Sequence, residues 1–226
     1  MVSDPGEPKP MMKLRIAKPR DAAGLAEVYW CTASKLPESF LPTLGRVFLA
    51  RYHRILIAEP NSIVLCLQDL NGRVVGFASG TSAMEEHMAA LSRNRVALVL
   101  SAIPAITRRP STLWAMYKRF RAARHCKGEE GFILGAGPRL EYWGCIEGAV
   151  ASAEALDLIR AWLAIFWRLG GHSVSCEVDH SNDRVLRIHK AFGAKVERKF
   201  ITGDGRERFI LKYDLNEEGT RRRIGI

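Results

Sequence analysis

The sequence predicts an α/β protein built on a mixed, seven-stranded sheet flanked by helices. The first observation is the order of patterns over residues 139–194, where strand, small-residue loop, long amphipathic helix, strand and short helix follow one another. The second is Asn71-Gly72 between two β-branched runs, a strong hairpin signal. The third is a closing pair of runs, 195–200 and 206–215, around a glycine-containing turn. Strands and helices in this alternation indicate a helix-covered sheet.

The centre of the chain predicts a strand over residues 139–146 that leads into the start of a helix. Residues 147–153 are mostly small, which leaves backbone N–H groups open to an anion at that point. The helix runs from about 153 to 169, and Gly170-Gly171 ends it. Its apolar residues recur at helical spacing: Leu156, Ile159, Leu163 and Phe166.

A further strand over 172–179 and a short helix over about 184–192 follow, and Gly193-Ala194 ends that helix. Because a helix crosses between the strands 139–146 and 172–179, we expect these two strands to pair in parallel.

The first eighty residues predict two helices and three strands. Pro19-Arg20-Asp21 is expected to form the turn and cap into the first helix, which runs through Tyr29. The expected strands cover 13–17, 62–69 and 73–80, the second helix covers 44–55, and a proline-containing loop covers 35–42.

Residues 84–137 predict a helical insertion between the third and fourth strands. Its expected helices cover 85–91, 96–106 and 112–124, with Pro104 and Pro110 breaking the region into pieces. Three uses stay open for it: a cover over a cleft, a membrane-surface or partner-binding helix, and a homodimer contact. At the ends of the chain, residues 1–12 are expected to be a disordered lead and residues 216–226 a loose, basic tail.

Composition favours one globular domain over residues 13–215, in a reducing, cytoplasmic setting. The five cysteines are scattered without CxxC spacing, which argues against disulfides and a metal site, and the N-terminus has no signal-peptide pattern. The formal net charge is +10, of which Arg108–Lys127 contributes +7 without an acid. This cluster suits an anion such as coenzyme A phosphates, an acidic substrate, a membrane surface or nucleic acid, or it is only a solvated helix face.

Two stretches carry a resemblance to the GCN5-related N-acetyltransferase (GNAT) family. The family loop Arg/Gln-x-x-Gly-x-Gly/Ala aligns so that Ala151-Ser152-Ala153 takes the Gly-x-Gly/Ala place, with Gly148 where the basic or amide residue stands. The family pattern Asn-x-x-Ala-x-x-Phe-Tyr-x-x-x-Gly-Phe aligns with 182–194, which puts His189 at the tyrosine position. The first strand and the 62–80 hairpin also resemble the family's opening.

The resemblance implies an acetyl-coenzyme A site. The pyrophosphate would lie on the backbone of the loop, formed by Ile146, Gly148, Val150, Ala151, Ser152 and Ala153, and Asn182 would hydrogen-bond the pantetheine arm. The family also implies that the fourth and fifth strands splay apart to admit the cofactor. Since alanine replaces glycine, we expect negative φ throughout 150–153.

Acetyl transfer to an amine needs a base for the amine proton, and an acid helps the thiolate depart. Glu141 is the base candidate, because some family members supply a glutamate from this strand, and Glu147 is the second choice. His189 is the acid candidate, since its ordinary pKa near 6.5 suits proton donation near neutrality better than that of tyrosine. Plain structural roles stay open for both residues. A nucleophilic Cys145 is disfavoured because the family transfers the acetyl group directly.

The expected function is therefore an N-acetyltransferase that moves an acetyl group from acetyl-coenzyme A to a small-molecule or peptidyl amine acceptor. Its alternative is a non-catalytic acyl-coenzyme A binder or interaction module on the same fold, which the degenerate loop makes plausible. Nucleic-acid binding through Arg108–Lys127 lacks a recognition motif that would raise it above charge alone.

Overall fold

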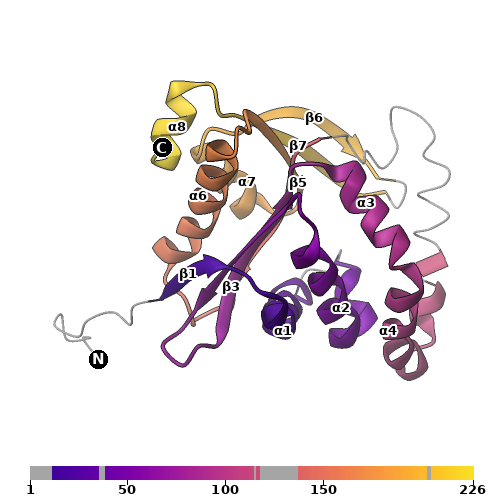
Figure 1. The fold of residues 1–226 in the computed structure, drawn as a ribbon. Helices are drawn as coiled ribbons and strands as arrows, with labels where there is room; N and C mark the ends of the chain where they lie inside the picture. Colours follow the sequence, from indigo (N-terminus) through magenta and orange to yellow (C-terminus); the bar gives the residue numbers. More distant parts are fainter. Residues whose placement is uncertain (1–11, 36–38, 115, 118–136, 203–204) are drawn as a thin grey trace, which may run out of the picture.

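The protein forms one seven-stranded sheet with helices on both faces, in a computed structural model that describes residues 12–35, 39–114, 116–117, 137–202 and 205–226 (Figure 1). The strand order is β1-β2-β3-β4-β5-β7-β6. β4 and β5 pair in parallel and the other neighbours are antiparallel, so the predicted mixed sheet is confirmed. The strands are β1 (Lys13–Ile16), β2 (Ser62–Gln68), β3 (Val74–Thr81), β4 (Arg139–Cys145), β5 (Ser173–Asp179), β6 (Lys195–Ile201) and β7 (Glu207–Asp214).

The helices divide between the two faces of the sheet (Figure 1). α1 and α2 cover one face and α6 the other, while α3 and α4 form the insertion beside α2. The helices are α1 (Ala22–Ala33), α2 (Gly45–Ala58), α3 (Met84–Arg93), α4 (Arg95–Arg108), α6 (Ser152–Arg168), α7 (Asp183–Ala191) and α8 (Glu218–Ile224), with short 3₁₀ turns η1 (Pro19–Asp21) and η2 (Leu41–Leu44).

The larger core lies between α6 and the sheet. Three residues of the apolar face that the sequence predicts for α6, Ile159, Leu163 and Phe166, are buried there, and Leu156 is partly buried. Full burial of a side chain of this kind stabilises the fold by about 1.5–3 kcal/mol. Trp162 donates its indole N–H to the carbonyl of Ile63 at 2.9 Å. A Cβ added at Gly80 would lie 2.4 Å from the Trp162 ring, so only glycine allows this close packing of helix on strand.

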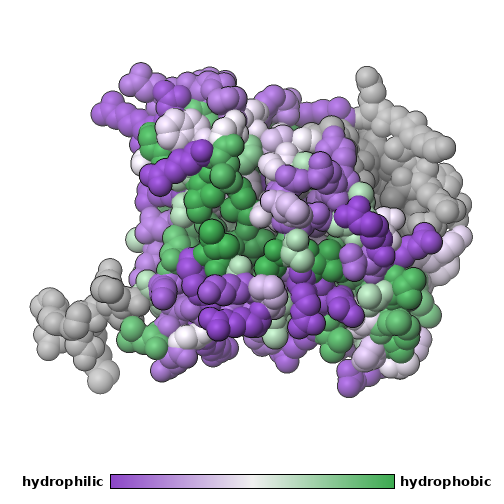
Figure 2. Space-filling model, viewed as in Figure 1, coloured by the Kyte–Doolittle hydropathy of each residue, from purple (hydrophilic) through white to green (hydrophobic). Residues whose placement is uncertain are grey.

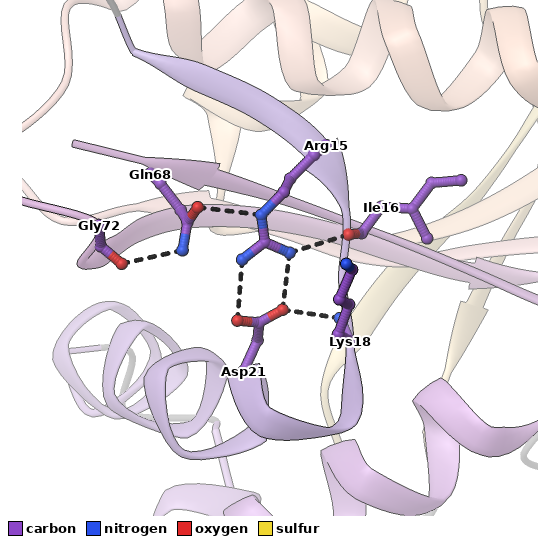
Figure 3. A network of polar contacts seen from close by, with 6 residues as sticks. All are labelled: Arg15, Ile16, Lys18, Asp21, Gln68 and Gly72. Carbon is purple, nitrogen blue, oxygen red and sulfur yellow. Dashed lines mark hydrogen bonds and ion pairs between the residues drawn. The ribbon is translucent and has the colours of Figure 1, made fainter. Parts of the chain in front are cut away.

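A buried ion pair joins β1 to the start of α1 (Figure 3). Arg15 donates to both carboxylate oxygens of Asp21, at 2.7 and 2.9 Å, and to Gln68 of β2. Asp21 also accepts from the backbone N–H of Lys18. The Arg15 hydrogen bonds hold the pKa of Asp21 below its ordinary value. Asp21 thus stands at the predicted helix entry, but its carboxylate turns back to β1 and makes no side-chain cap of α1.

Two local expectations were wrong. Pro104 lies inside α4 and does not break it, although its missing N–H removes one helical hydrogen bond. The tail beyond Asn216 is not loose, because it forms α8, whose Thr220 and Ile224 are buried against the rest of the protein. Arg221 donates to the carbonyls of Leu215 and Asn216, which ties α8 to the end of β7.

The predicted insertion begins as expected. α3 and α4 match the first two of its helices, and residues 111–114 and 116–117 are helical where the third was expected. The rest of that third segment lies outside the described residues. So do residues 118–127, which hold most of the basic cluster Arg108–Lys127, and nearly all of the predicted lead.

Candidate active site

The two central strands separate at Glu141. β4 pairs with β5 only at Arg139–Ser175 and Leu140–Cys176, so the strands diverge beyond these two pairs. The splay that the family resemblance implied is therefore present.

A β-bulge at the same point re-aims the side chains of β4. The β3–β4 register shifts between Ser79 and Gly80, where Gly80 faces Leu140 and Ser79 faces Tyr142. Leu140 points into the core under α6, whereas Tyr142 packs with the core under α1 and α2. Glu141 is the extra residue, and it contacts α2 and α3, so it shares the α1–α2 face with Tyr142.

Glu141 lies in a closely packed polar cluster. The Tyr52 hydroxyl of α2 donates to Oε2 at 3.4 Å, and His87 Nε2 of α3 lies 3.4 Å from Oε1. The side chain is 12% exposed. Burial raises the pKa of Glu141 above its ordinary value, although His87, Arg139 and the Tyr52 hydrogen bond oppose this. A carboxylate with a raised pKa, still reachable from solvent, suits a general base.

A second buried histidine lies beside this cluster. His53 of α2 packs against the rings of Tyr29, Tyr52 and Phe77 at centroid distances of 5.1–5.8 Å. Neither of its nitrogens has a hydrogen-bond partner among the residues that the structure describes, and burial lowers the pKa of His53 to about 3. No motif in the sequence singles out His53, His87 or Tyr52 as a site residue. The burial of His53 could have been found, since it lies on the apolar stripe of α2 between Leu49 and Leu56.

The small-residue loop reaches the N-terminus of α6 as expected. Gly148 has φ of +76°, and each of the residues 150–153 has negative φ, as the sequence predicted. Helix α6 begins at Ser152 after an extended Ala151, and the first-turn N–H groups of an α-helix have no intrahelical acceptor. Ala151, Ser152 and Ala153 are exposed, and Ile146 donates its N–H to Val75 at 2.8 Å. This end of α6 is open to an anion.

Charged side chains of both signs surround the loop. Lys35, at the end of α1, makes an exposed 2.6 Å ion pair with Glu147, and the pKa of Glu147 lies below its ordinary value because of Lys35, with a smaller effect of Arg184. Lys35 and Arg184 thus place positive charge near the loop, which lacks the family's basic residue. Glu154 places negative charge there, since its carboxylate accepts a hydrogen bond from the N–H of Ala151 at 3.1 Å.

His189 is buried between three strands. Its Nε2 accepts from the Trp143 indole of β4 at 3.4 Å, and its Nδ1 faces the Tyr213 hydroxyl of β7 at 2.7 Å, with Cys176 of β5 at 3.7 Å. Burial lowers the pKa of His189 to about 4, so the ring is neutral near pH 7. This geometry does not favour the expected proton-donor role. The ring instead holds Trp143 beside the gap between β4 and β5.

Two further sequence candidates have defined positions. The Asn182 carboxamide oxygen accepts from the N–H of Val185 at 3.3 Å, so it caps α7, and the structure assigns its Nδ2 no partner among the described residues. Burial raises the pKa of the Cys145 thiol to about 12, which leaves it a poor nucleophile.

No group of three or more His, Cys, Asp or Glu residues is placed to hold a metal ion in the part of the chain that the structure describes.

The strand order, the separating parallel pair and the helix start beyond β4 define the fold of the GCN5-related N-acetyltransferases. No protein-family model and no curated protein sequence matches the chain, so the similarity lies in structure.

The similar structures cover almost the whole chain. An N-acetyltransferase from Staphylococcus aureus Mu50 has a TM-score of 0.54 at 14% identity, over 91% of this chain and 99% of that chain. The yncA protein of Salmonella typhimurium, a proposed acetyltransferase solved with its cofactor acetyl-CoA, has a TM-score of 0.56 at 15% identity, over 92% and 96%. A spermidine N-acetyltransferase SpeG chimera, from Vibrio cholerae and hSSAT, has a TM-score of 0.54 at 11% identity, over 91% and 96%.

Proposed function

We propose that this protein is an acyl-CoA-dependent N-acyltransferase that moves an acetyl group from acetyl-CoA to a primary amine of a small-molecule or peptidyl acceptor. One observation carries the proposal: Glu141, buried and with a raised pKa, stands where β4 leaves β5. The open helix start at Ser152 lies at the carboxyl end of the same strand. The similar structures, which include acetyltransferases and one acetyl-CoA complex, support the same assignment.

Glu141, Tyr52 and His87 would have separate roles in acetyl transfer. Acetyl-CoA supplies the thioester, whose carbonyl carbon gains a bond to the amine nitrogen and loses its bond to sulfur. Glu141 takes the proton that the amine nitrogen gives up. Tyr52 and His87, which contact its two oxygens from α2 and α3, would hold the carboxylate in place on the α1–α2 face of the sheet. Helix α3 would thus lie along one side of Glu141, and the insertion would form a wall of the acceptor site.

The loop fits a diphosphate. Its groups are the backbone N–H groups from Val150 to Ala153, the positive end of the α6 dipole, and the ammonium of Lys35. Asn182, at the start of α7, would hold the pantetheine arm through Nδ2, because its oxygen is used by the cap. The Ala151–Glu154 contact has to open when the diphosphate binds.

The direct test is calorimetric titration with acetyl-CoA, followed by a panel of amines with thiol release as the readout. Binding with turnover on at least one amine supports the proposal. Binding without turnover on any amine would favour a non-catalytic acyl-CoA-binding module. If acetyl-CoA does not bind, both functions are excluded.

The loop assignment makes a prediction of its own. Glu154→Gln should tighten acetyl-CoA binding about two- to fivefold, because it removes a negative charge worth about 0.3–1 kcal/mol from the phosphate site at the helix N-terminus. Ala151→Leu should abolish binding by filling that site. Titration of both variants tests this, and Asp157→Asn, on the next turn of α6, is the matched control. Unchanged affinity in both loop variants would place the diphosphate elsewhere.

A further inference from the structure

The insertion presents an apolar stripe to solvent. Val96, Val99, Leu100 and Ile103 follow one another at helical spacing on α4, and each is between 45% and 66% exposed. Figure 2 shows this patch in green at lower right, over the α4 of Figure 1. The less exposed positions of α4 are mixed in size: Ala102 is buried, and Ala97, Leu98, Ser101, Ala105 and Ile106 are partly buried. An amphipathic helix of a globular protein normally turns its large apolar side chains inward, whereas α4 leaves four of them exposed in one stripe.

Neighbouring elements extend the patch. Val47 of α2 is exposed and lines a groove of about 750 Å³ together with Leu100 of α4. Beyond α4, Leu113, Trp114 and Tyr117 are also exposed, and the rings of Trp114 and Tyr117 stack at 5.5 Å. Tryptophan and tyrosine with an apolar body and a polar tip are the side chains that gather at a membrane–water interface.

Positive charge borders the patch. Between Glu86 and Glu129 the sequence contains no acid at all. Arg93, the last residue of α3, and Arg95, the first of α4, stand at one end of the stripe, and Arg108 and Arg109 at the other, all exposed. Arg51 and Arg54 of α2 line the groove that Val47 and Leu100 share. Among the described residues that line this groove Glu27 is the one acid, and it pairs with Arg46 at 3.0 Å. Aliphatic side chains thus lie between two groups of arginines.

The apolar stripe and the arginines that border it fit one of three possible partners: a second copy of the chain, nucleic acid or an anionic lipid surface. A second copy of the chain, docked through the same face, would bring like charges together. Nucleic acid could stack on Trp114 and Tyr117, but it would leave the aliphatic stripe of α4 unused, because that stripe offers neither hydrogen bonds to bases nor rings for stacking. An anionic lipid surface satisfies both features, since the stripe can enter the acyl boundary while the arginines meet headgroup phosphates.

We propose that α4, with Val47, Leu113, Trp114 and Tyr117, is a membrane-surface site that docks the protein on anionic phospholipid. Among the described residues no single helix is long and apolar enough to cross a bilayer, and α3 and α4 reach that length only together, with a 69° bend between them. Met84, His87 and Ala90 of α3 are buried in the protein, so this helix is held out of the lipid. The site therefore lies on the surface of the membrane. The proposal is independent of the acetyl-transfer chemistry.

Vesicle co-sedimentation of the whole protein tests this proposal. Wild-type protein should bind vesicles that contain phosphatidylglycerol, bind pure phosphatidylcholine vesicles much more weakly, and lose binding as salt is raised. Arg95→Gln and Arg108→Gln should each weaken binding about fivefold, the effect typical of one basic residue near an anionic surface. Leu100→Ser with Ile103→Ser should weaken it about tenfold or more. Leu70→Ser, at a more exposed apolar position in the β2–β3 turn, is the control and should leave binding unchanged.

The outcomes separate the partners. Equal binding to both vesicle types, or a double serine variant that binds like wild type, overturns the proposal. If the serine variant changes the sedimentation coefficient of the free protein, a second copy covers the face and the proposal is wrong. Binding to a duplex DNA probe that competes with the vesicles and is insensitive to the serine changes would assign the face to nucleic acid. Unchanged thermal melting of each variant shows that the fold is intact.

Discussion

Glu141→Gln is expected to lower kcat by about 10²–10⁴, the usual contribution of a positioned general base. The substitution keeps the size of the side chain and its contacts with Tyr52 and His87, but glutamine cannot accept the amine proton. Affinity for acetyl-CoA should change little, because the proposed diphosphate site is at the start of α6. The measurement is kcat by thiol release, together with acetyl-CoA affinity by titration.

Glu147→Gln is the matched control for this experiment. Glu147 is exposed beyond the end of β4 and pairs with Lys35, so its removal should leave kcat nearly intact. The wild-type kcat/KM should also rise with pH through a pKa above the ordinary glutamate value, because burial raises the pKa of Glu141. Full activity of Glu141→Gln, or a loss confined to Glu147→Gln, would show that Glu141 is not the base.

The second large effect concerns stability in acid. His53 and His189 have pKa values of about 3 and about 4 in the folded protein, against about 6.5 in the unfolded chain. Below about pH 6.5 the unfolded chain therefore takes up protons that the folded protein excludes. The free energy of unfolding should fall with pH by about 1.4 kcal/mol per unit for each histidine, down to about pH 4 for His189 and about pH 3 for His53.

Urea unfolding at a series of pH values between neutral and about pH 5 measures this effect. For the two histidines together we expect a loss of about 4 kcal/mol between about pH 7 and about pH 5. Glu141 acts in the opposite direction because its pKa is raised, so the informative quantity is the difference between variants. His53→Leu should remove the share of His53 in the slope. The exposed His180→Gln is the control, and a His53→Leu curve parallel to wild type would contradict the expectation.

Local patterns in the sequence determined most of the fold. Asn71-Gly72 predicted the β2–β3 hairpin, and the apolar spacing of α6 predicted both its burial and the parallel pairing of β4 with β5. These predictions succeed because each depends on residues within one or two elements. The exceptions are Pro104 and the tail, where tertiary contacts outweigh a local signal: α4 packs along α2, and α8 buries Thr220 and Ile224.

The sequence also selected Glu141, the loop at 147–153 and Asn182, but it could not decide the state of the candidate site. Glu141 gains its raised pKa from burial under α2 and the insertion, and its hydrogen bond to Tyr52 spans 89 residues of sequence. His189 loses its charge because Trp143, Cys176 and Tyr213 enclose it, from three different strands. A pKa depends on desolvation and on charges a few ångströms away in space, and only the tertiary structure brings those groups together.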